Sequence, residues 1–173
     1  GFDLLFRAYD RTAMGYAAAD KTKSKTWQDH PWIIEGDETK ESTVTTKQEQ
    51  QLAQMAKRSK LWQAMAEADL MRMVGGWSYL IMRVADGQPL HTETKANTLD
   101  AIVEFIPAWR GQMTVERYAS DGITPLLYSY RQQGQQETIH SIHASRVIAI
   151  GQEWVGRSLL QAGYNELVTL EKI

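Results

Sequence analysis

The chain has 173 residues and a net charge of -2, so it lacks the basic excess that is typical of nucleic-acid-binding domains. It contains no cysteine, which excludes disulfides and thiolate metal sites. There is no run of about eighteen apolar residues that would predict a membrane span, and the length favours one domain with an appendage over two sizeable domains.

The first part of the chain, residues 1–45, predicts a helix followed by an irregular arm. Apolar side chains recur on one side of residues 3–19, as expected for a helix. From residue 17 to 36 lysines alternate with small residues and tryptophans follow, a combination that can bind nucleic acid. Nearby acidic residues would cancel much of that field, so we favour a docked arm with a short strand at residues 32–34. An acidic, threonine-rich linker follows over residues 36–45.

The remaining part, residues 46–173, opens with a long amphipathic helix predicted over residues 46–73. Thr46 and Glu49 fit a capping box, in which each side chain satisfies a free backbone donor of the other residue. At about 1.5 Å per residue the helix would be on the order of 40 Å long, so we expect a bend near Ser59. Its apolar residues recur every three or four positions: Leu52, Met55, Trp62, Met65, Ala66, Leu70 and Met73.

Gly75 and Gly76 separate this helix from a segment with a different pattern. Residues 77–84 predict a strand that is apolar on both faces, which is typical of a central strand. Because the glycine pair carries no side chains, we expect the helix and the strand to pack closely where they join. Asp86 and Gly87 then predict a turn.

The rest of the chain predicts further strands and a last helix. The expected segments are a polar loop at 88–98, a strand at 99–106 ended by Pro107, a hairpin of 112–118 and 126–131 around a turn at 120–122, a polar turn at 132–136 and strands within 138–150. Ser158 and Gln161 fit a second capping box, which predicts the start of a helix still running at Ile173. That pattern, with Gly1 in place of an initiator Met, indicates a piece of a longer polypeptide.

These elements predict the α+β fold class. We expect a mixed, mainly antiparallel sheet, because five or more strands cluster after the long helix. The long helix should pack on this sheet, with further helices at the N-terminal and C-terminal sides.

Few residues predict a chemical site. Glu104 lies between apolar neighbours and could be a catalytic acid, but no second carboxylate is spaced to assist it, so a surface residue of an edge strand is the simpler interpretation. His140 and His143 would point to opposite faces of a strand and do not predict a metal site. We therefore predict no catalytic residue, no cofactor and no metal.

An alternative function is a carbohydrate- or peptide-binding α+β module that stacks its ligand on tryptophan rings. The predicted loops contain four such rings: Trp27, Trp32, Trp109 and Trp154.

Short phrases spread along the whole chain form a pattern in their order and spacing. They are Tyr9-Asp10-Arg11-Thr12-Ala13, Lys25-Thr26-Trp27, Gly75-Gly76 before Tyr79-Leu80-Ile81 and Asp86-Gly87, Ile106-Pro107-Ala108-Trp109, Ile142-His143-Ala144-Ser145-Arg146-Val147, and Gly156-Arg157-Ser158-Leu159-Leu160 before Tyr164. The most specific is His-x-Ser-Arg-Val after a strand, with a Ser-Leu-Leu phrase shortly after it. In these phrases the chain resembles the portal proteins of tailed double-stranded DNA bacteriophages.

The resemblance implies a structural virion protein that catalyses nothing, with this chain as the N-terminal, wing-like portion of a longer portal subunit. Portals form rings, typically dodecamers, at one capsid vertex, through which double-stranded DNA is packaged and ejected. The implied partners are identical portal subunits, the capsid protein, the terminase and the tail adaptor, with no membrane. The implied location is the virion, with the host cytoplasm during assembly.

The resemblance also marks positions in this sequence, and it assigns none of them to DNA contact. Arg146 is expected to tie the end of a strand to a neighbouring loop or carboxylate. The marked positions are Gly75, Gly76, Trp109, His143, Ser145, Arg146, Ser158 and Tyr164.

Overall fold

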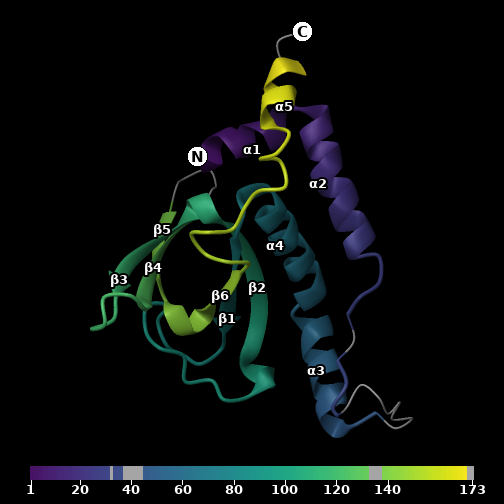
Figure 1. Ribbon diagram of the computed structural model, residues 1–173. Coiled ribbons are helices and arrows are strands. Elements are labelled where there is room, and N and C mark those ends of the chain that lie inside the picture. Colours follow the sequence, from purple (N-terminus) through teal and green to yellow (C-terminus); the bar gives the residue numbers. More distant parts are fainter. Residues whose placement is uncertain (32, 37–44, 133–137, 171–173) are drawn as a thin grey trace.

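The computed structural model describes residues 1–31, 33–36, 45–132 and 138–170, and its helices and strands confirm the α+β class (Figure 1). The helices are α1 (Phe2–Arg11), α2 (Ala13–Thr26), α3 (Lys47–Arg58), α4 (Leu61–Gly75) and α5 (Tyr164–Leu170). The strands are β1 (Ser78–Val84), β2 (Ile102–Trp109), β3 (Met113–Tyr118), β4 (Pro125–Gln132), β5 (Thr138–His143) and β6 (Val147–Ile150). Short 3-10 turns precede β2, β3 and β6: η1 (Leu99–Ala101), η2 (Arg110–Gln112) and η3 (Ala144–Arg146).

The strands form two antiparallel sheets, whereas the sequence predicts one mixed, mainly antiparallel sheet. The strand orders are β2-β1-β6 and β3-β4-β5, and every pairing between described strands is antiparallel. The chain passes from one sheet to the other twice, through η2 and through η3, so the sheets lie against each other. A cluster of buried side chains fills the space between them: Tyr79, Ile81, Ala108, Met113, Tyr128, Tyr130 and Ile142.

Strand β1 is central and buried on both faces, as predicted. Tyr79 and Ile81 point into the cluster between the sheets, whereas Leu80 points to the other side. There Leu80 packs with Phe105 of β2 and with Met55 of α3, next to the small side chains of α4. Alternate residues of one strand therefore contribute to two different cores.

The predicted long helix exists as two helices with a break between them. The capping box is confirmed, because the Thr46 N–H donates to Glu49 Oε2 at 2.9 Å and the Glu49 N–H donates to Thr46 Oγ1 at 3.2 Å. The bend expected near Ser59 is confirmed as the end of α3, where Ser59 Oγ donates to the Met55 carbonyl oxygen at 2.8 Å. Lys60 then adopts a left-handed conformation with φ of 52°, which separates α3 from α4.

The prediction for the N-terminal part is wrong in three respects. Thr12 is extended and divides the predicted helix into α1 and α2, and its Oγ1 accepts a hydrogen bond from the Gly15 N–H at 3.0 Å as the cap of α2. Helix α2 continues to Thr26, where an irregular arm was expected, because its alanines and lysines favour a helix. Ile33 and Ile34 do not form a strand, and Trp32 and residues 37–44 lie outside the described residues.

Two further predictions are corrected in the second half of the chain. Pro107 does not end its strand, because β2 lies at the edge of its sheet and an edge strand tolerates a residue without an N–H. Ser158 does not start the last helix, which begins at Tyr164; its Oγ instead accepts a hydrogen bond from the Leu160 N–H at 3.0 Å in a local turn. The hairpin of β3 and β4 is confirmed, and residues 133–136 of the predicted polar turn lie outside the described residues.

Candidate functional site: a buried arginine and the contacts between motif positions

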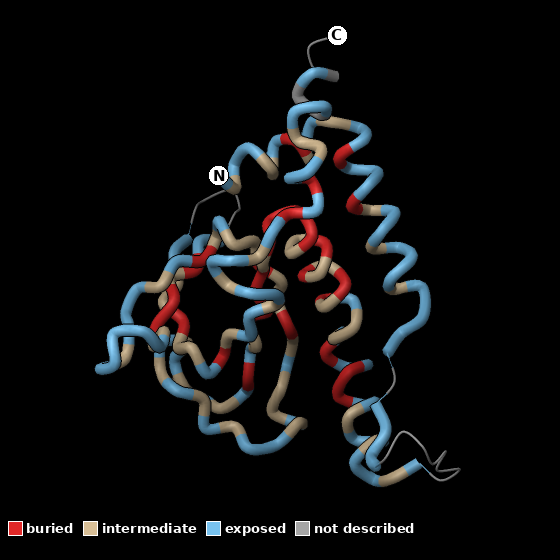
Figure 2. Tube along the Cα trace, in the orientation of Figure 1, coloured by how far each residue is buried: buried red, intermediate tan, exposed pale blue. Residues whose placement is uncertain are grey.

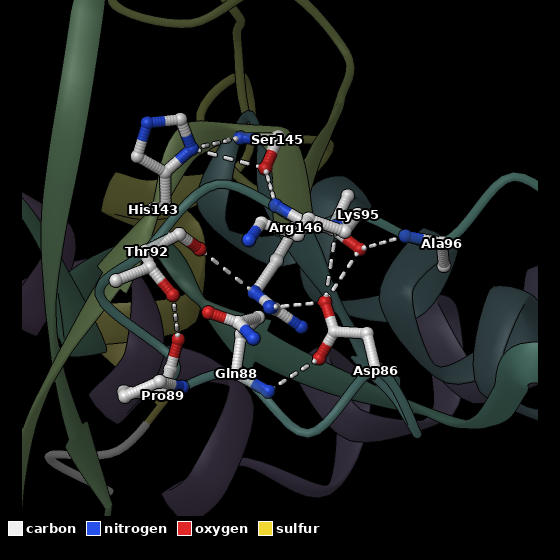
Figure 3. A network of polar contacts seen from close by, with 10 residues as sticks. Asp86, Gln88, Pro89, Thr92, Lys95, Ala96, His143, Ser145 and Arg146 are labelled. Carbon is white, nitrogen blue, oxygen red and sulfur yellow. Dashed lines mark hydrogen bonds and ion pairs between the residues drawn. The ribbon is translucent and has the colours of Figure 1, made fainter.

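Arg146 is a fully buried charged side chain at the end of η3. Its Nη2 donates to Asp86 Oδ2 at 2.6 Å, and its Nε donates to the carbonyl oxygen of Thr92 at 3.1 Å (Figure 3). The side chain of Asp86 is only 3% exposed. The guanidinium therefore ties the turn before β6 to the start and the middle of the loop that follows β1, which confirms the role expected for it.

Asp86 receives more hydrogen bonds than the one from Arg146. The N–H of Gln88 donates to its Oδ1 at 3.1 Å, while Thr94 Oγ1 and the Lys95 N–H donate to its Oδ2 at 3.0 Å and 3.2 Å. Burial by itself raises the pKa of this carboxyl, but these donors together with the guanidinium outweigh it and hold the pKa well below the usual range of an aspartate. The carboxylate is thus an ionised anchor at neutral pH and a poor proton acceptor.

His143 and Ser145 fix the turn that presents Arg146. The Ser145 N–H donates to His143 Nδ1 at 3.2 Å, and the Ser145 hydroxyl lies 2.9 Å from the same nitrogen. Ser145 Oγ also accepts a hydrogen bond from the Thr94 N–H at 3.0 Å, so the serine oxygen is held by the loop. The described residues give His143 no carboxylate partner, and the pair has the geometry of a turn cap, not of a nucleophile with its base.

Gly76 is a position of close backbone approach, as predicted, but its partner is a distant loop and not the adjoining strand. It ends α4 with φ of 93°, and a Cβ added there would overlap the carbonyl oxygen of Gly156. A Cβ added to Gly156 would in turn overlap the carbonyl oxygen of Gly76. Gly75 has more room, because its added Cβ would lie 3.4 Å from the Phe2 ring.

Trp109 joins α1 to the end of β2 through aromatic contacts. Its ring centroid lies 5.1 Å from that of Phe6 in an edge-to-face arrangement, 5.9 Å from that of Phe2 and 6.0 Å from that of Tyr9. Tyr164 packs half-buried against the same helical cluster. The motif positions on different elements therefore meet in the interior or at its border.

The other predicted chemical candidates have ordinary structural surroundings. Glu104 is half-exposed on the edge strand β2 and pairs with Arg83 Nε at 3.0 Å, which confirms it as a surface residue. The ring of His140 stacks on that of Tyr130, with centroids 6.5 Å apart. Within the described part of the chain, no group of three or more His, Asp or Glu side chains is arranged to hold a metal ion.

The three described tryptophans of the alternative function lie in separate surroundings and share no common surface. Trp27 Nε1 donates to Asp69 Oδ2 at 3.0 Å, and Trp109 belongs to the aromatic cluster of α1. Trp154 is 64% exposed beside Trp77 and is the one exposed ring of the three that the structure describes. Trp32 lies outside the described residues.

Comparison with known proteins adds no family to this geometry. The chain matches no protein-family model, and a search of curated proteins found no match. None of the helices within the described ranges has the length and the apolar character that crossing a bilayer requires.

Proposed function

We propose that this chain is a structural virion protein, the wing-like part of the portal ring at the capsid vertex of a tailed bacteriophage. The observation that carries the proposal is that the phrases of the resemblance contact one another in pairs across the fold. The pairs are Tyr9 with Trp109, Gly76 with Gly156, and Asp86 with Arg146.

Each pair joins elements that are far apart in the sequence. Tyr9 and Trp109 join the first helix to an edge strand, and Asp86 and Arg146 join a long loop to the turn before the last strand. The positions that carry the resemblance are thus structural contacts, which fix how helices, strands and loops pack together. This supports a fold framework shared with portal proteins. A subunit of a large ring needs rigid surfaces for contact with the adjacent subunits, and a rigid framework with fixed loops provides them.

In this proposal the chain has no catalytic role of its own. Its partners are identical subunits in a ring, typically of twelve, together with the capsid protein, the terminase and the tail adaptor, while double-stranded DNA passes through the complete ring. The alternative of a tryptophan-based binding module has less support. The three described tryptophans lie on separate elements, and Trp27 and Trp109 make contacts within the fold.

The test uses the complete product of the reading frame that encodes this chain. Native mass spectrometry and negative-stain electron microscopy should show a closed ring of identical subunits. An antibody raised against the 173-residue chain should label a single vertex of the assembled capsid, and adsorbing the antibody with the purified chain should abolish the label. A monomeric product, or a label distributed evenly over the capsid, would overturn the proposal.

A further inference from the structure

A groove of about 760 Å³ runs along one side of helix α2. Its opposite wall consists of the loop after β6, with Leu159 and Leu160, and of helix α5, with Glu166. Figure 2 shows α2 as mostly exposed along its length, and only Gly15 and Ala19 of this helix are buried. The helix thus packs on the fold by one narrow stripe and leaves another side open.

The floor of the groove is apolar. Met14 and Ala18 are one turn apart on α2 and line the groove together with Leu159. Met14 is 61% exposed and Leu159 is 48% exposed, so both present apolar surface to solvent. The lining extends along α2 as far as Thr26, which at about 1.5 Å per residue is roughly 18 Å, or about three helical turns. A groove of this shape matches the apolar face of another helix.

The rim of the groove carries charged side chains on both walls. Lys21 and Lys25 line the groove on the α2 side, one turn apart, where like charges repel each other. Neither forms an ion pair with any residue that the structure describes, whereas Lys23 of the same helix pairs with Glu67 of α4. Glu166 stands on the opposite wall and gives that side the other sign.

We propose that this groove binds an amphipathic helix of a partner protein. The apolar face of that helix would cover Met14, Ala18 and Leu159, with acidic residues beside Lys21 and Lys25 of α2. A basic residue on its other flank would lie near Glu166, so the two walls together set the direction of the bound helix. This inference does not depend on the proposed ring, since the groove lies within one chain.

The probe is a fluorescein-labelled peptide of about 18 residues, long enough to span the groove as a helix. It carries leucine at every third or fourth position, glutamates along one flank and lysines along the other. Fluorescence polarisation should show saturable binding to the 173-residue chain. The double variant Lys21→Glu/Lys25→Glu should weaken binding by at least about tenfold, because two attractive charge pairs become repulsive.

Two controls separate the groove from general charge effects. Lys47→Glu/Lys57→Glu changes the net charge by the same amount on α3, outside the groove, and should leave binding unchanged. Ala18→Arg places a long side chain on an exposed helical position in the groove and should abolish binding without unfolding the chain.

Three results would overturn the proposal. The first is the absence of binding, and the second is equal binding to the chain and to Lys21→Glu/Lys25→Glu. The third is a dimer in sedimentation experiments that Ala18→Arg dissociates, because the groove would then hold a second copy of the chain and not a partner helix.

Discussion

The strand half of this molecule (β1 to β6 with the loops between them) and the helical half (α1 to α5) each contain positive side chains whose surroundings differ. In the strand half Arg146 is fully buried, and it is held by Asp86 and the loop after β1. In the helical half Lys21 and Lys25 stand at the rim of an open groove with no ion-pair partner among the described residues. A buried charge survives only with its partner, whereas an exposed charge costs little and stays available for another molecule. The charge of Arg146 is therefore paired within the fold, whereas Lys21 and Lys25 stay available for the partner helix that we propose.

The largest expected effect comes from removing the buried charge of the strand half. Arg146→Met should lower the free energy of unfolding by about 3–5 kcal/mol, because the substitution leaves the ionised Asp86 buried without its cation. Urea denaturation followed by tryptophan fluorescence would measure this loss.

Arg83→Met is the matched control for that experiment. It removes the same charge from an ion pair with Glu104 that is half-exposed, and it should cost only about 0–1 kcal/mol. Equal losses for the two variants would contradict the distinction between the buried pair and the surface pair.

The second effect concerns the close backbone approach between the end of α4 and the loop that follows β6. Gly76→Leu combines a left-handed backbone, with φ of 93°, and an overlap with Gly156, so it should destabilise the fold by roughly 3 kcal/mol. Gly87→Leu separates the two causes, since Gly87 has φ of 67° but no neighbour within 4 Å of an added Cβ. Thermal unfolding should therefore show the larger loss for Gly76→Leu, and an unchanged melting temperature would contradict the close approach.

The sequence predicts the structure best where one local pattern determines it. The capping box of Thr46 and Glu49 and the two-sided strand β1 are local signals, and both were predicted correctly. The break at Thr12 was missed, because the apolar period continues across it and only the cap geometry ends α1. The sequence also does not predict that α2 continues to Thr26. The aromatic and charged residues near its end are typical of an irregular arm, although its alanines and lysines favour a helix.

Only the local part of the candidate site can be predicted from the sequence. The residue type and position of Arg146 after a strand indicate an anchor, but its partner Asp86 is sixty residues away, and the local sequence around Asp86 predicts only a turn. The approach of Gly156 to Gly76 has no sequence signal beyond the glycines themselves. Contacts between residues far apart in the sequence depend on how distant elements pack. The periodicity of residues within one element does not predict them.

Acid should weaken the strand half gradually. The pKa of Asp86 is lowered in the folded chain, so its stabilising contribution is fully present above the unfolded-state pKa of about 4 and is lost as the pH falls below that value. Melting temperatures measured between pH 7 and pH 2.5 should fall more steeply for the unmodified chain than for Asp86→Asn. The variant cannot lose this charge, so the difference between the two curves isolates Asp86 from the other carboxylates. Parallel curves would contradict its assignment as the ionised anchor.

The smallest effect tests the helical half and has opposite signs in two measurements. Lys21→Glu replaces a repulsion with Lys25 by an attraction one turn along α2, so it should stabilise the chain by about 0.5 kcal/mol. The stability of Lys21→Gln should lie between that of the unmodified chain and that of Lys21→Glu. The stabilisation by Lys21→Glu should be smaller in high salt, because salt screens the charges. The same Lys21→Glu change should weaken the binding of the acidic peptide. A substitution that improves the isolated chain while impairing its complex would mean that this charge serves a partner. If stability and binding instead changed in the same direction, the groove would be no different from any other solvated face.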